Sequence, residues 1–445
     1  MGLTDVQGLP LSGATKNAAK HYRRAVDVFN VFKGDPMGAL DAAIQDAPNF
    51  VMAYLLRAHL LALTTQADTT LEARKILDHV RDRPMDDRER SHLAALDHLC
   101  AGNWTDAANA LARHQMEWPH DIVALQSGHN MDFFRADARE LRDRVARTLP
   151  LWSPDLPGYS VVLGMYAFGL EEMGDYGRAE AMGREAIARD ARDSWAHHAV
   201  AHVFEMEGRA ADGIAWMEDR SPHWASDDDF FKTHNWWHKA LCYLEIDEPA
   251  RALEVYDAHI RADGDPVVFG LLDGSALLWR LWASGVDVGQ RWQSLARAWE
   301  PHLQGTGYPF NDWHGAMALL GAGQVAEVDA MILRLKSAGE GSEAAIWATT
   351  TGLALVQGFR AFATGDFEAA VSHLFPARQI AGRFGGSHAQ RDVIDWTVTE
   401  AALRGKMPGA ARCMAQERLA LRPHSPVNRR FLKRAESLGA EYAPI

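Results

Sequence analysis

The chain has 445 residues, of which 47% are hydrophobic and 24% charged, a composition that excludes a largely disordered protein. Its 46 basic and 59 acidic residues give a formal charge of -13, which argues against a nucleic-acid backbone or an anionic membrane surface as the main partner. The three cysteines are far apart and form no C-x-x-C motif, so they support neither a disulfide framework nor a cysteine zinc site.

The opening residues, MGLTDVQGLPLSG, contain no basic segment followed by an apolar one. No apolar run in the chain approaches the roughly 18 residues of a membrane span. We therefore expect a cytoplasmic protein with no membrane partner. Residues 1–16 are predicted to form an N-terminal arm before the first helix.

One pattern recurs along the chain: a helical stretch, a small or turn residue, an alanine about five residues later, and a second apolar-periodic stretch. It is found in CAGNWTDAANAL, EEMGDYGRAEAM, LEIDEPARALEVY and FATGDFEAAVSHL, which begin at Cys100, Glu171, Leu244 and Phe362. A recurrence of roughly 34 residues with this turn is typical of tetratricopeptide repeats, in which each unit is a pair of antiparallel helices.

The repeats predict an all-α, tetratricopeptide-like superhelix, or solenoid, of about ten or eleven degenerate helix pairs from near residue 17 to near residue 422. A terminal helix is expected over 426–438. Irregular stretches after Gly264 and around LQGTGYPFND are predicted to be insertions. Residues 17–445 are accordingly expected to form a single continuous domain.

In such repeats the first helix of each pair lines the concave surface, so its polar residues are candidates for a site. In chain order, SGHNMDFFRAD places His129 and Asp132 on one helix face. WAHHAVAHVFEMEGR then places His198, His202 and Glu205 on one face, at spacings of four and three residues.

The following repeats continue this polar and aromatic face. THNWWHKALCYLEID offers His234 and Trp237 with His238 beside them, and GSALLWRLWASG offers Trp279 and Trp282. FNDWHGAMALLGAG offers Trp313 with Asp312 and His314 adjacent, and GGSHAQRDVIDW offers Arg391 and Asp392. Together they predict a pocket with a few oriented polar groups.

Several of these residues have a simpler interpretation. His198 and His202 have the spacing of metal ligands, but they also fit two histidines hydrogen-bonded in a polar core. Asn311 is expected to cap the helix that begins in FNDWHG, and Asp312 fits either a cap or a site. Arg391 and Asp392 fit a surface ion pair.

Seven separated blocks resemble, along nearly the whole chain, the tetratricopeptide repeat protein 38 family. They are GLPLS, NFVMAYLLRA, HAVAHVFEM, HNWWHKAL, VGQRWQ, FNDWH and GGSHAQRDV. The resemblance implies one all-α solenoid and a shared polar pocket, but no established activity. The implied pocket residues are His198, His202, Glu205, His234, Trp237, His238, Asp312, His314, Arg391 and Asp392. The chain departs from the family at Lys239, where an aromatic residue is expected, and at His388, where some members carry asparagine.

Our leading hypothesis is that this pocket is a small-molecule active site for hydrolytic or other acid/base chemistry. On this hypothesis the protein is an enzyme. The catalytic residues would be His198, His202, Glu205, His234 and Asp312. The substrate-binding residues would be His129, Asp132, Trp237, His238, Trp279, Trp282, Trp313, His314, Arg391 and Asp392. The cofactor would be none or a divalent transition metal such as zinc, with His198 and His202 as its ligands.

The competing hypothesis is a non-enzymatic tetratricopeptide scaffold that binds a peptide or a partner protein in its groove. Grooves that clamp a peptide carboxylate use lysine and arginine, whereas the predicted face here carries mostly histidine, tryptophan and glutamate. The sequence thus predicts a small-molecule ligand first, a peptide second, and no nucleic acid.

Overall fold

A computed structural model describes residues 2–260, 267–303 and 307–441. Throughout these ranges the regular structure is helical, and the only strand-like pairings in them are two isolated bridges, Thr4 with Pro10 and Lys33 with Asp229. The predicted all-α class is therefore confirmed. Residues 261–266 and 304–306, which belong to the two predicted insertions, lie outside the described residues.

The described residues pack into two compact units. Unit 1 contains the described residues up to Val200 together with Ser221–Lys232 and Ser342–Ala344. Unit 2 contains Ala201–Arg220 and the described residues of Thr233–Gly341 and from Ala345 onwards. The division falls within the two middle helices, α11 (Ser194–Met206) and α12 (Ala210–Trp224). The single continuous domain expected from residue 17 stays a prediction.

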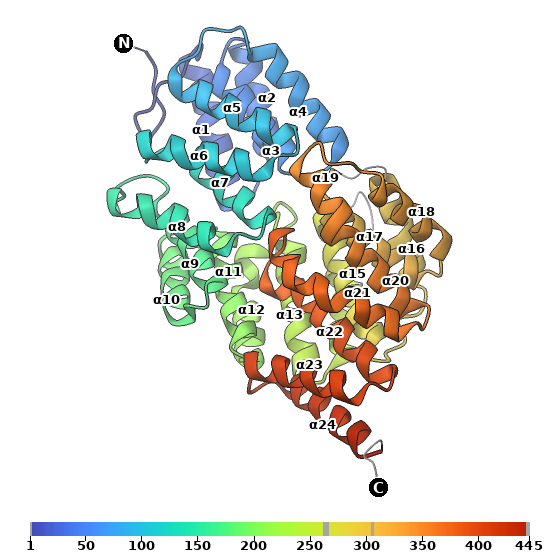
Figure 1. The fold of residues 1–445 in the computed structure, drawn as a ribbon. Coiled ribbons are helices and arrows are strands. Elements are labelled where there is room, and N and C mark those ends of the chain that lie inside the picture. The colour runs from blue at the N-terminus through green and yellow to red at the C-terminus, as the bar shows by residue number, and fades with distance from the viewer. Residues whose placement is uncertain (1, 261–266, 304–306, 442–445) are drawn as a thin grey trace. The chain divides into compact units, whose positions relative to one another are not determined.

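Unit 1 is built from successive helix pairs, coloured blue to green in Figure 1. Its helices are α1 (Lys16–Val31), α2 (Pro36–Asp46), α3 (Val51–Ala62), α4 (Ala67–Val80), α5 (Asp87–Cys100), α6 (Trp104–Glu117), α7 (Ile122–Phe134), α8 (Ala138–Thr148), α9 (Tyr159–Glu172) and α10 (Tyr176–Arg189). Each odd-numbered helix packs against the even-numbered helix that follows it. The N-terminal arm precedes α1, whose N-cap is Thr15.

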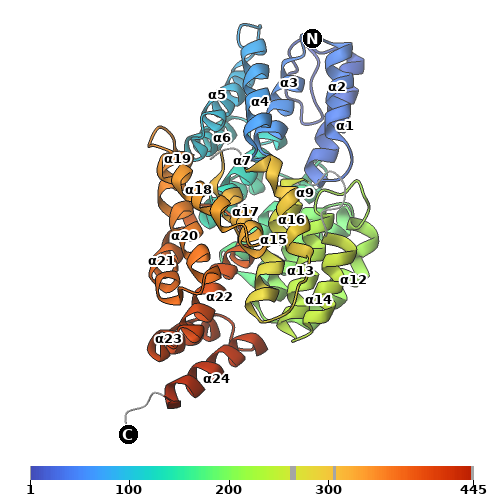
Figure 2. The same ribbon diagram turned by 90° about the vertical axis from the view of Figure 1, so that its right-hand side faces the viewer.

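Unit 2 continues the same pattern, and Figure 2 shows its later helices α15–α24 in yellow to red. Its helices are α13 (Lys232–Glu245), α14 (Pro249–Val255), α15 (Val268–Ala283), α16 (Arg291–Trp299), α17 (Pro309–Gly321), α18 (Val325–Lys336), α20 (Leu353–Ala363), α21 (Phe367–Ile380), α22 (His388–Arg404), α23 (Pro408–Leu421) and α24 (Pro426–Glu441). The short helix α19 (Glu343–Trp347) precedes α20. In chain order the described helices thus form eleven successive pairs followed by α24, as the repeats predict.

The predicted turns share one backbone feature. Gly102, Gly174 and Gly365 join the helices of their pairs with φ of +82°, +78° and +82°, and Asp247 does the same with φ of +65°. A left-handed residue ends a helix by redirecting the chain, and glycine adopts this conformation without steric cost. The recurring small residue in the sequence pattern is therefore the residue that reverses the chain.

The two helices of a pair differ in burial. In α7 every residue from Ile122 to Phe133 is buried, whereas α8 buries only four of its residues. α15 and α17 are also buried almost throughout. A polar side chain on α7, α15 or α17 is consequently inside the protein, where it requires a partner. No described helix has the length and apolarity required to cross a bilayer.

Close approach of α8 and α9 allows a test of this packing. A Cβ atom at Gly169 would lie 2.6 Å from the backbone of Arg142, whereas one at Gly177 would meet no atom within 4 Å. We expect Gly169→Ala to lower the free energy of unfolding by about 1–3 kcal/mol. The matched variant Gly177→Ala, in α10, should leave it unchanged or raise it by up to about 1 kcal/mol. Urea unfolding of both variants measures the difference, and equal values would contradict the described helix contact.

Candidate functional site

Three helices of unit 2 bring imidazoles and carboxylates together in what we call the histidine centre: His202, Glu205, His234, His238 and Asp273. The end of α11 supplies the first two residues, α13 the next two and α15 the last. Within α11 and α13 the residues are three or four positions apart, so they share a helix face. All three histidine residues are at most 1% exposed. Four of the predicted site residues therefore meet in one buried cluster.

The hydrogen bonds of the histidine centre form a single chain. Glu205 Oε2 lies 2.9 Å from His238 Nδ1, and His238 Nε2 lies 3.2 Å from His234 Nε2. His234 Nδ1 in turn lies 2.8 Å from Asp273 Oδ1. The ring of His202 packs against that of His238, with centroids 4.4 Å apart. One ligand atom of each of the three histidines lies within 4.8 Å of the others, so this set has the donors for a metal ion.

The two facing Nε2 atoms restrict where the protons of this chain can be. If Glu205 is protonated, it donates to His238 Nδ1, His238 Nε2–H donates to His234, and His234 Nδ1–H donates to ionised Asp273. Every contact then pairs one donor with one acceptor. If Glu205 is ionised, both Nδ1–H groups donate to carboxylates and two lone pairs face each other across 3.2 Å. That state requires an additional proton or a cation between His234 and His238.

The protonation of Glu205 is poised near neutrality. Burial raises the pKa of Glu205 to about 7, although His202, Arg422 and Arg280 each lower it. Burial also raises the pKa of Asp273, while His234 lowers it. A carboxyl group with this pKa can both donate and accept a proton under physiological conditions, which is the property required of a general acid or base.

A small cavity of about 20 Å³ adjoins the histidine centre, and its lining includes Glu205, Arg280, Asp392 and Arg422. That volume holds about one water molecule. Asp392 forms ion pairs with Arg418 at 2.9 Å and Arg422 at 2.6 Å. Burial raises the pKa of Asp392, but Arg418, Arg422 and Arg280 together hold it below its usual range. The predicted partner Arg391 instead donates to the carbonyl of Gly386.

The predicted tryptophans of unit 2 are mostly inside the protein. Trp237 is fully buried and stacks on His234, with centroids 5.1 Å apart, and the Arg280 guanidinium lies 5.6 Å from its ring centre. Trp279 and Trp313 are also fully buried, and Trp282 packs against Trp279 at 5.1 Å. A binding role for these indoles stays a prediction.

Asp312 and His314 lie on α17, apart from the chain of hydrogen bonds described above. Burial raises the pKa of Asp312 to about 7, while Arg334, 3.3 Å away, lowers it. His314 Nδ1 donates to the Phe310 carbonyl at 2.9 Å, and burial lowers its pKa to about 3. The N-cap of α17 is Tyr308, so the cap expected at Asn311 is wrong because the helix begins at Pro309, two residues earlier.

The remaining predicted residues belong to unit 1. His198, one turn before His202 on α11, packs against the rings of Trp195 and Phe231 at 5.1 and 5.3 Å. His129 accepts a hydrogen bond from Trp195 Nε1 at 3.3 Å, and burial lowers its pKa to about 3. His129 is therefore a neutral acceptor in an aromatic cluster.

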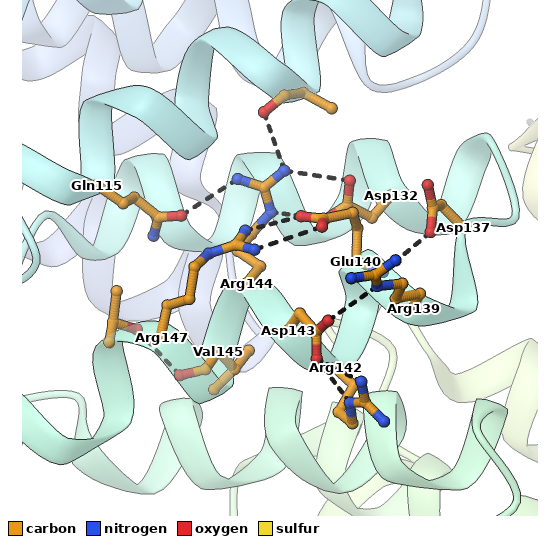
Figure 3. A network of polar contacts seen from close by, with 12 residues as sticks. Gln115, Asp132, Asp137, Arg139, Glu140, Arg142, Asp143, Arg144, Val145 and Arg147 are labelled. Atoms are coloured by element: carbon orange, nitrogen blue, oxygen red, sulfur yellow. Dashed lines mark hydrogen bonds and ion pairs between the residues drawn. The ribbon is translucent and has the colours of Figure 1, made fainter.

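Asp132 is held by a buried arginine. Figure 3 shows Arg144 between Asp132 and Gln115, with Arg144 Nε 2.6 Å from an Asp132 oxygen and its Nη1 3.2 Å from Gln115. Both members of the ion pair are completely buried. A Cβ atom at Gly128 would lie 2.7 Å from the Arg144 guanidinium, so the glycine makes room for it. Asp132 is thus already held in a structural ion pair.

Unit 1 also contains a histidine and carboxylate cluster that sequence reasoning missed. Asp121 Oδ2 accepts from His92 at 3.1 Å, His114 at 3.2 Å and Arg88 at 2.8 Å, and His59 Nε2 lies 3.0 Å from His92. Asp121 is also the N-cap of α7. In the sequence these residues come from three consecutive repeats, with His59 on α3, Arg88, His92 and His114 on the pair α5 and α6, and Asp121 at the start of α7.

Sequence reasoning also missed four ionic residues around the histidine centre: Asp273, Arg280, Arg418 and Arg422. Asp273 and Arg280 stand in LLDGSALLWR, and a charged residue inside an otherwise apolar helix was the available signal. Arg418 and Arg422 carry no such signal, because a last-turn arginine is common at the end of any helix.

Glu205 gives a pH prediction. Between about pH 4.5 and 7 the unfolded glutamate has lost a proton that the folded one keeps, so this group makes stability fall as pH rises through that window. Glu205→Gln should remove up to one proton of this dependence, about 1.4 kcal/mol per pH unit at most. Urea unfolding at pH 5 and pH 7 tests it. Glu207→Gln, an exposed glutamate two residues later, is the control; identical pH dependence in all three proteins would contradict the assignment.

No protein-family model matches the chain. Three solved structures show similarity: the hetero-tetramer Cut9-Hcn1 of the APC/C, at 15% identity over 94% of this chain and 76% of that chain with a TM-score of 0.43; human IFIT1 dimer with m7Gppp-AAAA, at 14% over 94% and 95% with 0.42; and the TPR domain of P58(IPK), at 11% over 81% and 100% with 0.23. At these values the helical-repeat assignment rests on the helix pairs themselves, and the finer family resemblance stays a prediction.

Proposed function

We propose that this protein is a helical-repeat scaffold that binds a segment of a partner protein, and that its histidine centre is a closed, buried site rather than an open active site. The observation that supports this is the contrast between two places in unit 2. The residues His202, His234 and His238 are at most 1% exposed, beside a cavity for about one water molecule. The C-terminal ends of α13 and α15, the second half of α22 and the first half of α24 instead line a larger cavity nearby.

We call this larger cavity the C-terminal groove. It has a volume of about 500 Å³, within the range of natural ligand sites. Apolar side chains and charged side chains both line it. The apolar ones are Leu244, Pro249, Val286, Trp396, Val427 and Phe431, and the charged ones are Asp247, Glu400, Arg404, Arg430 and Arg434. A groove lined by both apolar and charged side chains can hold the side chains of a bound peptide.

The charges of the groove favour an acidic partner. Glu400, 3% exposed, accepts from Arg404 at 2.8 Å and from Arg434 at 2.7 Å. Arg430 pairs with Asp247. Three arginines thus meet two carboxylates, which leaves one positive charge over. Arginine presents forked donors that suit a carboxylate, so the proposed ligand is a peptide with an apolar anchor next to an acidic side chain or a free C-terminus.

A display library of random peptides with free C-termini tests this proposal. We expect selected peptides to combine an apolar residue with an acidic residue or terminal carboxylate. The double variant Arg430→Glu/Arg434→Glu should bind them at least about tenfold more weakly, because the groove then repels the acidic group.

The matched control is Arg429→Glu/Lys433→Glu, which makes the same charge change at exposed positions of α24 that do not line the groove. Fluorescence anisotropy measures both variants. Absence of any selected peptide, or equal affinity in the two double variants, would contradict the groove as the binding site.

A second candidate function, acid/base or metal-assisted chemistry, is favoured by one observation. His234 and His238 each have Nδ1 beside a carboxylate, while their Nε2 atoms face each other at 3.2 Å. Metal-binding histidines commonly have such a carboxylate on the second nitrogen. His202 would add a third ligand, and His198 and His202 remain the ligand pair proposed from the sequence. A metal ion bound there would supply a Lewis acid or an activated water.

Metal content separates the two candidates. We measure it by mass spectrometry on protein purified without a metal-binding tag, for wild type and for His198→Ala, His202→Ala and His238→Ala. A metal centre predicts about one equivalent in wild type, lost in the ligand variants while helical circular dichroism is retained. His314→Ala, on α17, is the control. A metal-free wild type that still binds peptides in the groove would contradict the metal centre and support the scaffold function.

A further inference from the structure

Unit 1 contains its own cavity, remote in sequence from the residues of the histidine centre. It has a volume of about 570 Å³ and lies between the arm residues 4–7, one face of α1 and the beginnings of α7 and α9. Natural small-molecule sites have this size. We call it the arm pocket.

Four basic residues of α1 line the arm pocket: Lys16, Lys20, Arg23 and Arg24. Their spacing of four, seven and eight residues from Lys16 places them on one side of the helix. All four are exposed, and within the described ranges none of them forms an ion pair. In a chain with a formal charge of -13, this is a local excess of positive charge.

The carboxylates around the pocket cancel only part of this charge. Four of them line it, and two arginines outside the lining, Arg88 and Arg192, each pair with two of the four, so the four cations of α1 outnumber the two negative charges that are left. Arg192 pairs with Asp27 at 3.0 Å and with Asp190 at 2.7 Å. Asp121 accepts from Arg88 and two histidines, as described above. Asp5 accepts backbone hydrogen bonds from Gln7 at 3.0 Å and Leu9 at 2.9 Å.

Two residues of the wall each carry a buried polar atom without a hydrogen-bond partner. Tyr22 and Asn30 both line the arm pocket and are 2% and 5% exposed. The Tyr22 hydroxyl and the Asn30 Oδ1 have no hydrogen-bond partner among the described residues. A buried polar atom without a partner costs about 1–3 kcal/mol, so a molecule that satisfies both atoms gains affinity. The Asn30 oxygen can only accept, which requires a donor such as a hydroxyl group on that molecule.

The beginning of α9 adds donors for an anion. Its N-cap is Gly158 at φ +89°, which provides no capping side chain, and Gly158, Ser160 and Val161 line the arm pocket. The first N–H groups of a helix have no partner within the helix and carry partial positive charge. Such an end binds phosphate or carboxylate groups readily.

From the unpaired cations, the uncapped helix end and the two unsatisfied polar atoms, we infer that the arm pocket binds a small organic phosphate that also carries hydroxyl groups. The basic residues of α1 and the start of α9 hold the phosphate oxygens. Tyr22 donates to an oxygen of the ligand, and Asn30 accepts from one of its hydroxyl groups. This site is independent of the C-terminal groove.

Isothermal titration calorimetry on the full chain tests the inference with three probes: fructose bisphosphate, inorganic pyrophosphate and fructose. We expect fructose bisphosphate to bind most tightly, pyrophosphate more weakly and fructose not measurably. The affinity should fall as salt is added, because the cations are exposed. No binding of either phosphate would overturn the inference, and equal binding of both would overturn the role of the hydroxyl groups.

Two variants locate the site. Lys20→Glu/Arg24→Glu should weaken fructose bisphosphate at least about tenfold. Tyr22→Phe should weaken it less, with pyrophosphate changed little. The control Lys75→Glu/Arg113→Glu makes the same charge change at exposed residues of unit 1 that do not line the pocket. Equal affinity in the two double variants would overturn the assignment to the arm pocket.

Discussion

A polar group buried between helices must find its partner inside the protein, and this requirement shapes both units. First helices such as α7, α15 and α17 are buried almost throughout, so each histidine, carboxylate or arginine on them needs a partner inside the protein. The chain Glu205–His238–His234–Asp273 meets the requirement in unit 2, with contacts of 2.8 to 3.2 Å. Such contacts fix how neighbouring repeats are placed, because apolar contacts alone tolerate sliding and these do not.

The two units use similar residues and shift the pKa of a buried carboxyl group in opposite directions. Asp121 receives Arg88, His92 and His114, and although burial raises its pKa, these donors hold it well below the usual range. Glu205 contacts a single imidazole within hydrogen-bond distance, and burial leaves its pKa at about 7. The number of donors on a carboxylate therefore decides whether a buried cluster is a fixed charge or a group that exchanges protons. Only the cluster in unit 2 has the second property.

The helix pairs and their turns could be predicted from the sequence, because glycine or aspartate at a left-handed turn leaves a local signal, as at Gly174 and Asp247. The pairing of HAVAHVFEM with HNWWHKAL could be predicted because the residues lie on consecutive first helices. Asp273 and Arg280 left a signal that was missed, a charge inside an apolar helix, whereas Arg422 left none, since a last-turn arginine is common at the end of any helix. The complete burial of Trp237 could not be predicted either. Helical spacing shows which face of the helix a residue occupies, but it gives no information on how closely the next helix covers that face.

The buried pair of Asp132 and Arg144, with Gly128 beside it, restricts how this protein can change over generations. Loss of Asp132 leaves the buried charge of Arg144 alone, at a cost of about 3–5 kcal/mol, and loss of Arg144 leaves Asp132 with Arg135 at 3.0 Å as its remaining partner. Replacing both residues by apolar ones is often neutral. A lineage can therefore leave this arrangement only by crossing an intermediate that folds poorly. Gly128 is restricted in the same way, since the Cβ atom of any other residue there would meet the guanidinium of Arg144. The three positions should be inherited together, and in distant relatives they should be found either all present or all replaced.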